Sequence, residues 1–148
     1  MSKDAVDVPL TALKRYSAFI EPIWCIDYAI TRKEVSQAIR CRFFLDKEMN
    51  RYIFPQIQCQ YDFHDECLRD LHIWRVAYLV THPDPKPISL DVGIPHMDCY
   101  VDWIVQDGHH RLAAAFYRND KTIPASIAGC VRTAEELLGI SLSHLKAS

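Results

Sequence analysis

Hydrophobic and polar positions follow clear periods in the second half of the chain. Short apolar runs predict strands at residues 88–92, 103–106 and 122–128. A loop or hairpin is expected between the first two of them. Residues 109–119 have apolar side chains at the i, i+4 spacing of a helix, and their three successive alanines suit close packing on a sheet.

The first half of the chain is less regular. Residues 8–13 indicate a short edge strand, and residues 31–49 have helical apolar spacing among mixed charges. Residues 52–61 alternate as a strand does. Residues 65–81 are long enough for a helix, although their branched and aromatic centre also suits a strand, and we favour the helix. A proline-rich connector follows at 82–87.

Two capping boxes mark helix starts in the sequence. Thr31 is followed three residues later by Glu34, and Thr133 is followed by Glu136. The second box opens a short helix that should end at Gly139. The order of elements predicts an α+β fold, with a small mixed β-sheet and packed helices in a single domain of residues 1–148.

The composition is that of an ordinary globular protein. The 148 residues are 49% hydrophobic and 24% charged, and the formal net charge of −2 gives no global attraction to nucleic acid. The polar N-terminus does not resemble a signal peptide, and no apolar run has the length of a membrane span. We therefore expect a soluble, cytoplasmic protein without a membrane partner.

The cysteine pattern argues against disulfides and against a zinc site. None of the six cysteines forms a Cys-x-x-Cys pair, and none lies near a paired histidine in a zinc-finger pattern. Without an export signal, the thiols are expected to be reduced. We expect Cys25 and Cys130 to be small core residues, and Trp24, Trp74 and Trp103 to be core anchors.

The most informative segment joins the strand at 103–106 to the helix at 109–119. It reads Asp107, Gly108, His109, His110 and Arg111. The first turn of a helix carries about half a positive charge and unpaired N–H groups, so basic side chains there need a negative partner. A phosphate would supply it, because helix starts bind anions and glycine lets a ligand approach the backbone.

These residues also allow a purely structural interpretation. Asp107 would then be the N-cap of the helix and Gly108 would ease the turn, while both histidines would be neutral and idle. A metal site is a third interpretation, since Asp107, His109 and His110 are all metal-ligand types. Adjacent histidines on a helix point about 100° apart, which disfavours a shared ion.

Phosphoryl transfer is the most concrete mechanism for this segment. Gly108, His109 and His110 would offer backbone N–H groups to the phosphates, and Arg111 would neutralise charge. Asp107 and His110 are the candidate catalytic residues: Asp107 would deprotonate an acceptor hydroxyl or hold Mg²⁺, and the imidazole would neutralise charge. Asp91 is a secondary candidate, with a turn residue as the alternative.

The motif resembles the ParB/sulfiredoxin-like superfamily, over about residues 86–128. Members of that superfamily hold nucleotide phosphates at a Gly-x-x-Arg or Gly-x-His-Arg motif, which corresponds here to Gly108–Arg111. Sulfiredoxins carry their catalytic cysteine where this chain has His109, so sulfinic-acid reductase activity is not expected. The aspartate of similar free-serine kinases matches Asp107.

The resemblance implies a core at about residues 62–140 with an N-terminal extension at 1–61. It implies ATP or CTP as the ligand, with or without Mg²⁺, and a phosphotransferase or nucleotide hydrolase that acts on a small-molecule or protein acceptor. Partition proteins add a helix-turn-helix domain after this core, and 21 residues follow Ile127 here, so full partition function is not expected of this chain alone. The acidic residues 62–66 are a candidate for the missing second nucleotide box.

Two other function classes stay open. The first is a non-catalytic nucleotide-sensing or partner-binding module. The second is a DNA-associated ParB-like nuclease, because residues 32–51 are locally basic. Acidic residues are interleaved in that stretch, which favours a solvated helix face over nucleic-acid binding. The remaining histidines show no i, i+4 pairing and are expected to be surface or partly buried residues.

Overall fold

The structure is a computed structural model, and it describes residues 5–24, 26–46 and 65–143, with the backbone alone at 65–68. The described residues contain a four-stranded sheet of order β1-β4-β2-β3. β1 is antiparallel to β4, β4 is parallel to β2, and β2 is antiparallel to β3. The predicted α+β class with a small mixed sheet is therefore confirmed.

The strands are β1 (Val6–Pro9), β2 (Ile88–Asp91), β3 (Val105–Asp107) and β4 (Thr122–Ala128). Alternation along β2 buries Ile88 and Leu90 and leaves Ser89 half-buried. The prediction of β4 is confirmed, whereas β3 begins two residues later than expected and includes Asp107. β1 belongs to the same sheet as the three later strands.

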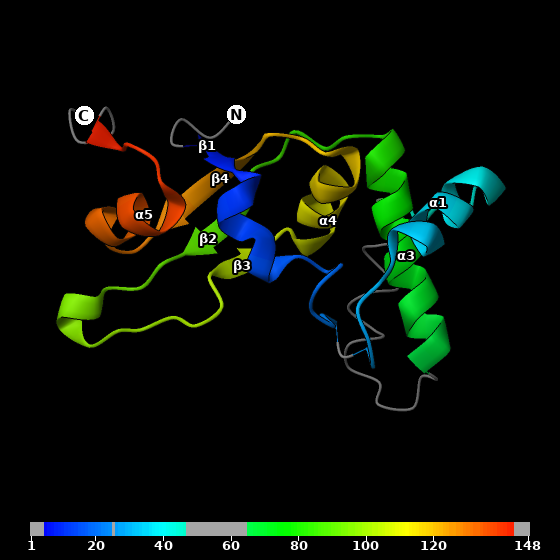
Figure 1. Cartoon of the computed structure of the whole chain (residues 1–148), viewed down its shortest axis with the longest axis horizontal. Helices are drawn as coiled ribbons and strands as arrows, with labels where there is room; N and C mark the ends of the chain where they lie inside the picture. The colour runs from blue at the N-terminus through cyan, green and yellow to red at the C-terminus, as the bar shows by residue number, and fades with distance from the viewer. Residues whose placement is uncertain (1–4, 25, 47–64, 144–148) are drawn as a thin grey trace.

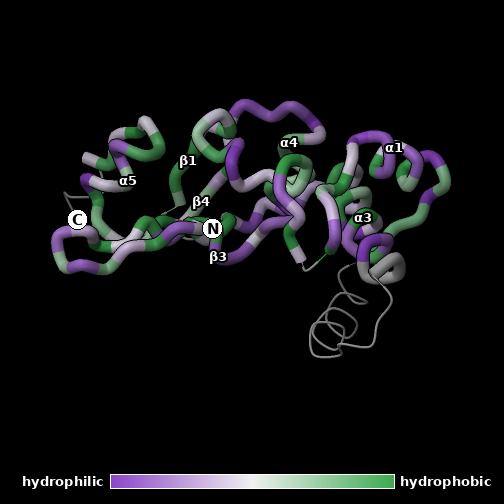
Figure 2. The backbone as a smooth tube through the Cα atoms, turned by 60° about the horizontal axis from the view of Figure 1, so that its bottom comes forward, coloured by the Kyte–Doolittle hydropathy of each residue, from purple (hydrophilic) through white to green (hydrophobic). Residues whose placement is uncertain are grey.

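The helices are α1 (Arg32–Cys41), α3 (Asp65–Thr81), α4 (His109–Arg118) and α5 (Val131–Leu138), with short 3-10 helices η1 (Leu10–Tyr16) and η2 (Pro95–Met97). Helix α3 confirms the helical interpretation of residues 65–81. Hydrophilic and hydrophobic residues alternate along α1 (Figure 2), as expected for a helix with one buried face. The strand predicted at 52–61 lies outside the described residues.

Two sequence predictions of local structure are wrong. Residues 10–13, expected within a strand, belong to η1, because Leu10, Leu13 and Tyr16 are buried at intervals of three, the period of a 3-10 helix. The capping box at Thr133 is absent, because α5 starts at Val131 with Cys130 as its N-cap. The box at Thr31 is present, and α5 ends at Gly139 as predicted.

Helix α4 lies between the sheet and the α1–α3 pair (Figure 1). Its Leu112 and Ala115 belong to the apolar cluster over the sheet, whereas Ala113 and Ala114 belong to the cluster with α1 and α3. The small alanine side chains let α4 contact both layers closely. The first turn of α4 is therefore fixed from two sides, and it carries the segment singled out in the sequence.

Candidate functional site

The turn from β3 into α4 is built around Gly108. Its φ of 99° is in the left-handed region, and a Cβ there would lie 2.5 Å from Cγ2 of Ile88 and 2.9 Å from Nη2 of Arg111. Both the backbone conformation and the available space therefore require glycine. The guanidinium of Arg111 sits directly against the backbone of this turn.

Gly108, and not Asp107, is the N-cap of α4. No side chain among the described residues caps this helix start. The first intrahelical bond runs from the N–H of Leu112 to the carbonyl oxygen of Gly108, at 2.8 Å. The backbone N–H groups of His109, His110 and Arg111 precede that bond, so they belong to the end of the helix that attracts anions.

Asp107 is directed away from the core by an irregularity in the β2–β3 pairing. Leu90 pairs with Val105 and Ser89 pairs with Asp107, so the register shifts by one residue between the two pairs. Such bulges turn a side chain to the other face of a sheet. The Asp107 side chain is 66% exposed.

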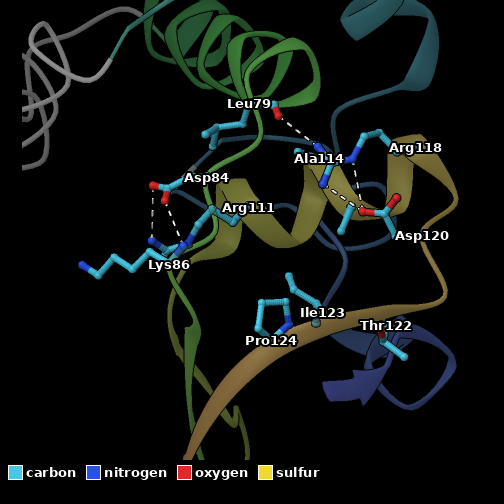
Figure 3. A pocket seen from close by; sticks show the side chains of 11 residues that line it. Leu79, Asp84, Lys86, Arg111, Ala114, Arg118, Asp120, Thr122, Ile123 and Pro124 are labelled. Atoms are coloured by element: carbon cyan, nitrogen blue, oxygen red, sulfur yellow. Dashed lines mark hydrogen bonds and ion pairs between the residues drawn. The ribbon is translucent and has the colours of Figure 1, made fainter. Parts of the chain in front are cut away.

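Arg111 contacts two carboxylates through long ionic contacts. Its Nη2 lies 3.3 Å from Oδ2 of Asp107. Its Nη1 lies 3.9 Å from Oδ2 of Asp84 (Figure 3). Charge-assisted hydrogen bonds of arginine are usually about 2.7–2.9 Å long. Its Nε is buried and has no hydrogen-bond partner among the described residues. Arg111 therefore retains donor capacity although its side chain is only 13% exposed.

Two hollows adjoin this turn and share Asp84 and Lys86. A small cavity of about 60 Å³ is lined by Arg111, Arg118 and the start of β4 (Figure 3). An open groove of about 550 Å³ lies beside β2. It is lined by Asp107 and seven other residues: Asp84, Pro85, Lys86, Pro87, Ile88, Ser89 and Ser126. Its volume is within the range of small-molecule sites.

A row of polar residues crosses the sheet at the groove. Ser89 of β2 is opposite Asp107 of β3 on one side and opposite Ser126 of β4 on the other. Directly opposed residues of neighbouring strands present their side chains on the same face. The groove thus combines hydroxyl groups, the carboxylates of Asp84 and Asp107, and the ammonium group of Lys86.

The His109 side chain is held by a hydrogen bond from Trp103, six residues earlier in the chain. Nε1 of Trp103 donates to Nε2 of His109 at 2.9 Å. Burial lowers the pKa of His109, against the opposing charge of Asp107. The imidazole is thus neutral, with its own proton on Nδ1.

His110 joins a cluster on the other side of α4. Its Nε2 lies 2.8 Å from Nδ1 of His72, and the indole of Trp24 stacks on both rings at centroid distances of 4.4 Å. Burial, with the neighbouring His72 and two arginines, holds the pKa of His110 well below its usual range. The structure places this imidazole with α3, whereas Asp107 lines the groove.

The positive charge expected at the start of α4 is thus smaller than the sequence suggests, because other groups of the same chain reduce it. Both histidines are neutral because they are buried, and Arg111 has two carboxylate neighbours. The basic residues alone therefore do not require an external anion. The features that still point to one are the uncapped N–H groups and the unused donors of Arg111.

Sequence reasoning missed three residues around this turn. His72 is fully buried, although a surface or partly buried position was expected; its place among apolar residues of α3 was the available signal. Trp24 stacks on histidines, and Asp84 reaches Arg111 from the connector. Asp91 accepts a hydrogen bond from the N–H of Gly93 at 2.9 Å, which fits a turn residue.

Other expectations concern metals, cysteines and membranes. Across residues 5–24, 26–46 and 65–143, no group of three or more histidine, cysteine or acidic side chains is arranged to hold a metal ion. Cys130 is half-buried rather than a core residue, and Cys41, Cys99 and Cys130 are free thiols. No helix in the described part of the chain is long and apolar enough to cross a membrane. Most of the acidic stretch at 62–66 lies outside the described residues.

Comparison with protein-family models, with curated proteins and with solved structures finds no match for this chain.

Proposed function

We propose that this protein binds the phosphate groups of a nucleotide at the start of α4, with the rest of the ligand in the groove beside Asp107. One observation carries the proposal. The glycine-led start of α4 has no side-chain cap, and it lies under a guanidinium whose two ionic contacts are long. Uncapped N–H groups and a loosely engaged arginine together suit an anion with several oxygens.

The local charges allow an exchange of partners. A phosphate oxygen would take the place of Asp107 beside Arg111, because the exposed Asp107 side chain is free to turn toward solvent. Lys86 adds a positive charge at the junction of the groove and the small cavity. Asp84 opposes the anion, but its Oδ1 already accepts the N–H of Lys86 at 2.9 Å. That bond fixes the connector that forms one wall of the groove.

The same arrangement supports phosphoryl transfer. Asp107 is an exposed carboxylate at the edge of the groove, where it can accept the proton of an acceptor hydroxyl or of water. His110 contributes its backbone N–H in this proposal, because its imidazole is engaged with His72. The resemblance of the Gly108–Arg111 motif to the ParB/sulfiredoxin-like superfamily supports ATP or CTP as the nucleotide.

A non-catalytic nucleotide sensor is the second candidate. It is favoured by the commitment of both imidazoles, since His109 accepts from Trp103 and His110 contacts His72. Product formation with a panel of hydroxyl acceptors and water separates the two candidates. A nuclease is less favoured than either nucleotide-binding candidate. Arg32, one of the basic residues of 32–51, donates to the carbonyl oxygens of Phe116 and Tyr117 and so serves a contact within the fold.

The test is thermal unfolding with ATP, CTP, GTP and pyrophosphate, each with and without Mg²⁺. A ligand at a hundred times its Kd stabilises the native state by about 2.7 kcal/mol, which raises Tm by about 5–10 °C in a chain of this size. The Arg111→Ala variant should lose that shift. Arg132→Ala, in an exposed ion pair on α5, is the matched control and should keep it. Absence of a shift with every ligand would contradict the proposal.

A further inference from the structure

We propose that the cluster of Trp24, His72 and His110 is an acid-sensitive latch. At neutral pH it holds the segment that carries Trp24 against α3 and α4, and on acidification it releases that segment. This inference stands independently of the proposed nucleotide binding.

Three separate parts of the chain meet in this latch. His72 comes from α3 and His110 from the first turn of α4, and their imidazoles are 2.8 Å apart at Nδ1 and Nε2. The indole of Trp24 lies nearly parallel to both rings, at interplanar angles of 7° and 11°. One flat side chain therefore covers both partners of the histidine pair.

The backbone at Trp24 is in an unfavourable conformation. Its φ of 64° lies in the left-handed region, which bulky residues rarely adopt. Such a conformation persists only where the surroundings hold it. Trp24 is held by its stacking on the two imidazoles and by its packing against the apolar cluster of α1 and α3. Weakening the stack removes one of these two restraints on the backbone.

Charged groups around the pair set the cost of protonation. Arg75 from α3 and Arg111 from α4 oppose a further positive charge on His110, as do His72 and His109 when charged. Asp84 of the connector and Asp46 after α1 act on Arg75 and partly offset its charge. An imidazolium would gain a modest cation–π attraction to the indole of Trp24, but it would lose its hydration in this buried position.

Linkage gives the direction of the pH effect. Burial lowers the pKa of His72 to about 3, and it holds the pKa of His110 well below the usual value. Both rings are therefore neutral in the folded protein while the unfolded chain binds protons below about pH 6.5. The contribution of each ring to stability is present above about pH 6.5 and is lost as the pH falls toward the folded pKa.

The first test is urea unfolding at pH 7.5 and pH 5.0. Each latch histidine should lower the folding equilibrium constant about thirty-fold over this interval, and both together about a thousand-fold. The variants His72→Gln and His110→Gln each remove one titrating ring. In each variant the folding equilibrium constant should therefore fall only about thirty-fold between pH 7.5 and pH 5.0. His96→Gln removes an exposed histidine of η2 and should leave the loss as in the wild type. An unchanged loss in both latch variants would overturn the proposal.

The second test needs no histidine variant to fold. In NMR spectra of the wild-type protein, the imidazole rings of His72 and His110 should stay neutral at pH 5.5. Titration of these two rings at ordinary histidine values would overturn the latch. Release is then followed by indole fluorescence without urea as the pH is lowered from 5.5 toward 3, where His72 becomes protonated in the folded protein. Trp24→Phe should abolish the acid-induced change and Trp74→Phe should keep it, whereas an equal change in both variants would contradict a local release.

Discussion

Nη2 of Arg111 lies 3.3 Å from Oδ2 of Asp107, four residues earlier in the chain. This contact joins the last residue of β3 to the first turn of α4 across the backbone of Gly108. It is too long for a strong charge-assisted bond, and its carboxylate is largely exposed. The pair is therefore suited to opening when a competing anion arrives, which is the basis of the proposed nucleotide site.

Replacing Asp107 by asparagine should separate binding from catalysis. Asp107→Asn keeps the shape of the side chain and removes the charge that competes with phosphate for Arg111, so nucleotide affinity should stay equal or rise several-fold. Turnover should be abolished, because the amide cannot accept the acceptor's proton. Calorimetric titration measures the affinity, and a phosphate-release or product assay measures the turnover. Loss of binding in this variant would argue against the role of base.

Replacing Gly108 by alanine should destabilise the fold by about 2–4 kcal/mol, since the Cβ combines an unfavourable φ with a collision against Ile88. Gly139 supplies a matched control, because its φ is 64° but a Cβ there meets nothing within 4 Å. Gly139→Ala should cost only about 1 kcal/mol. Urea unfolding measures both, and equal losses would show that space at Gly108 is not limiting.

The two threonines of the predicted capping boxes should behave differently. Oγ1 of Thr31 accepts the N–H of Glu34 at 3.2 Å, so Thr31→Ala should lower the free energy of unfolding by about 1 kcal/mol. Thr133 lies inside the first turn of α5, so Thr133→Ala should change that free energy by less than about 0.5 kcal/mol. Chemical denaturation of the two variants checks this difference. A similar loss in both would mean that Thr133 caps α5 in solution.

Removal of Arg69 should be among the most costly single changes. Its Nε donates to Oε2 of Glu34 at 2.8 Å, and its Nη atoms donate to the carbonyl oxygens of Tyr28 and Ala29. Arg69→Met leaves Glu34 and both carbonyl groups without these donors, so the expected loss is about 3 kcal/mol. Arg132→Met breaks an exposed pair on α5 and should have an effect near zero. Comparable losses would contradict the burial of Arg69.

The sequence predicts elements that are marked by a long apolar segment or by a local capping motif. The length of the apolar segment at 65–81 and the capping box at Thr31 correspond to α3 and to the start of α1. The prediction fails where a three-residue spacing resembles a short strand, as at Leu10–Tyr16, and where a box motif falls inside a helix, as at Thr133. Both failures arise because neighbouring turns, and not the motif itself, decide where a helix begins.

Contacts between distant residues could not be predicted in this way. Asp84 meets Arg111, and His72 meets His110, only after α3 and α4 have packed. A local motif shows that basic residues gather at a helix start, but it does not show which of them are neutral or already paired. The motif at Gly108–Arg111 was visible in the sequence, whereas its electrostatic balance depends on the fold.

Nucleotide binding at the start of α4 is tested most directly by an NMR titration of the backbone amides with the nucleotide that raises Tm most. The amide signals of His109, His110 and Arg111 should move first and saturate together, and Arg111→Ala should abolish these shifts. Unchanged signals at these residues, with shifts elsewhere or none at all, would contradict nucleotide binding at the start of α4.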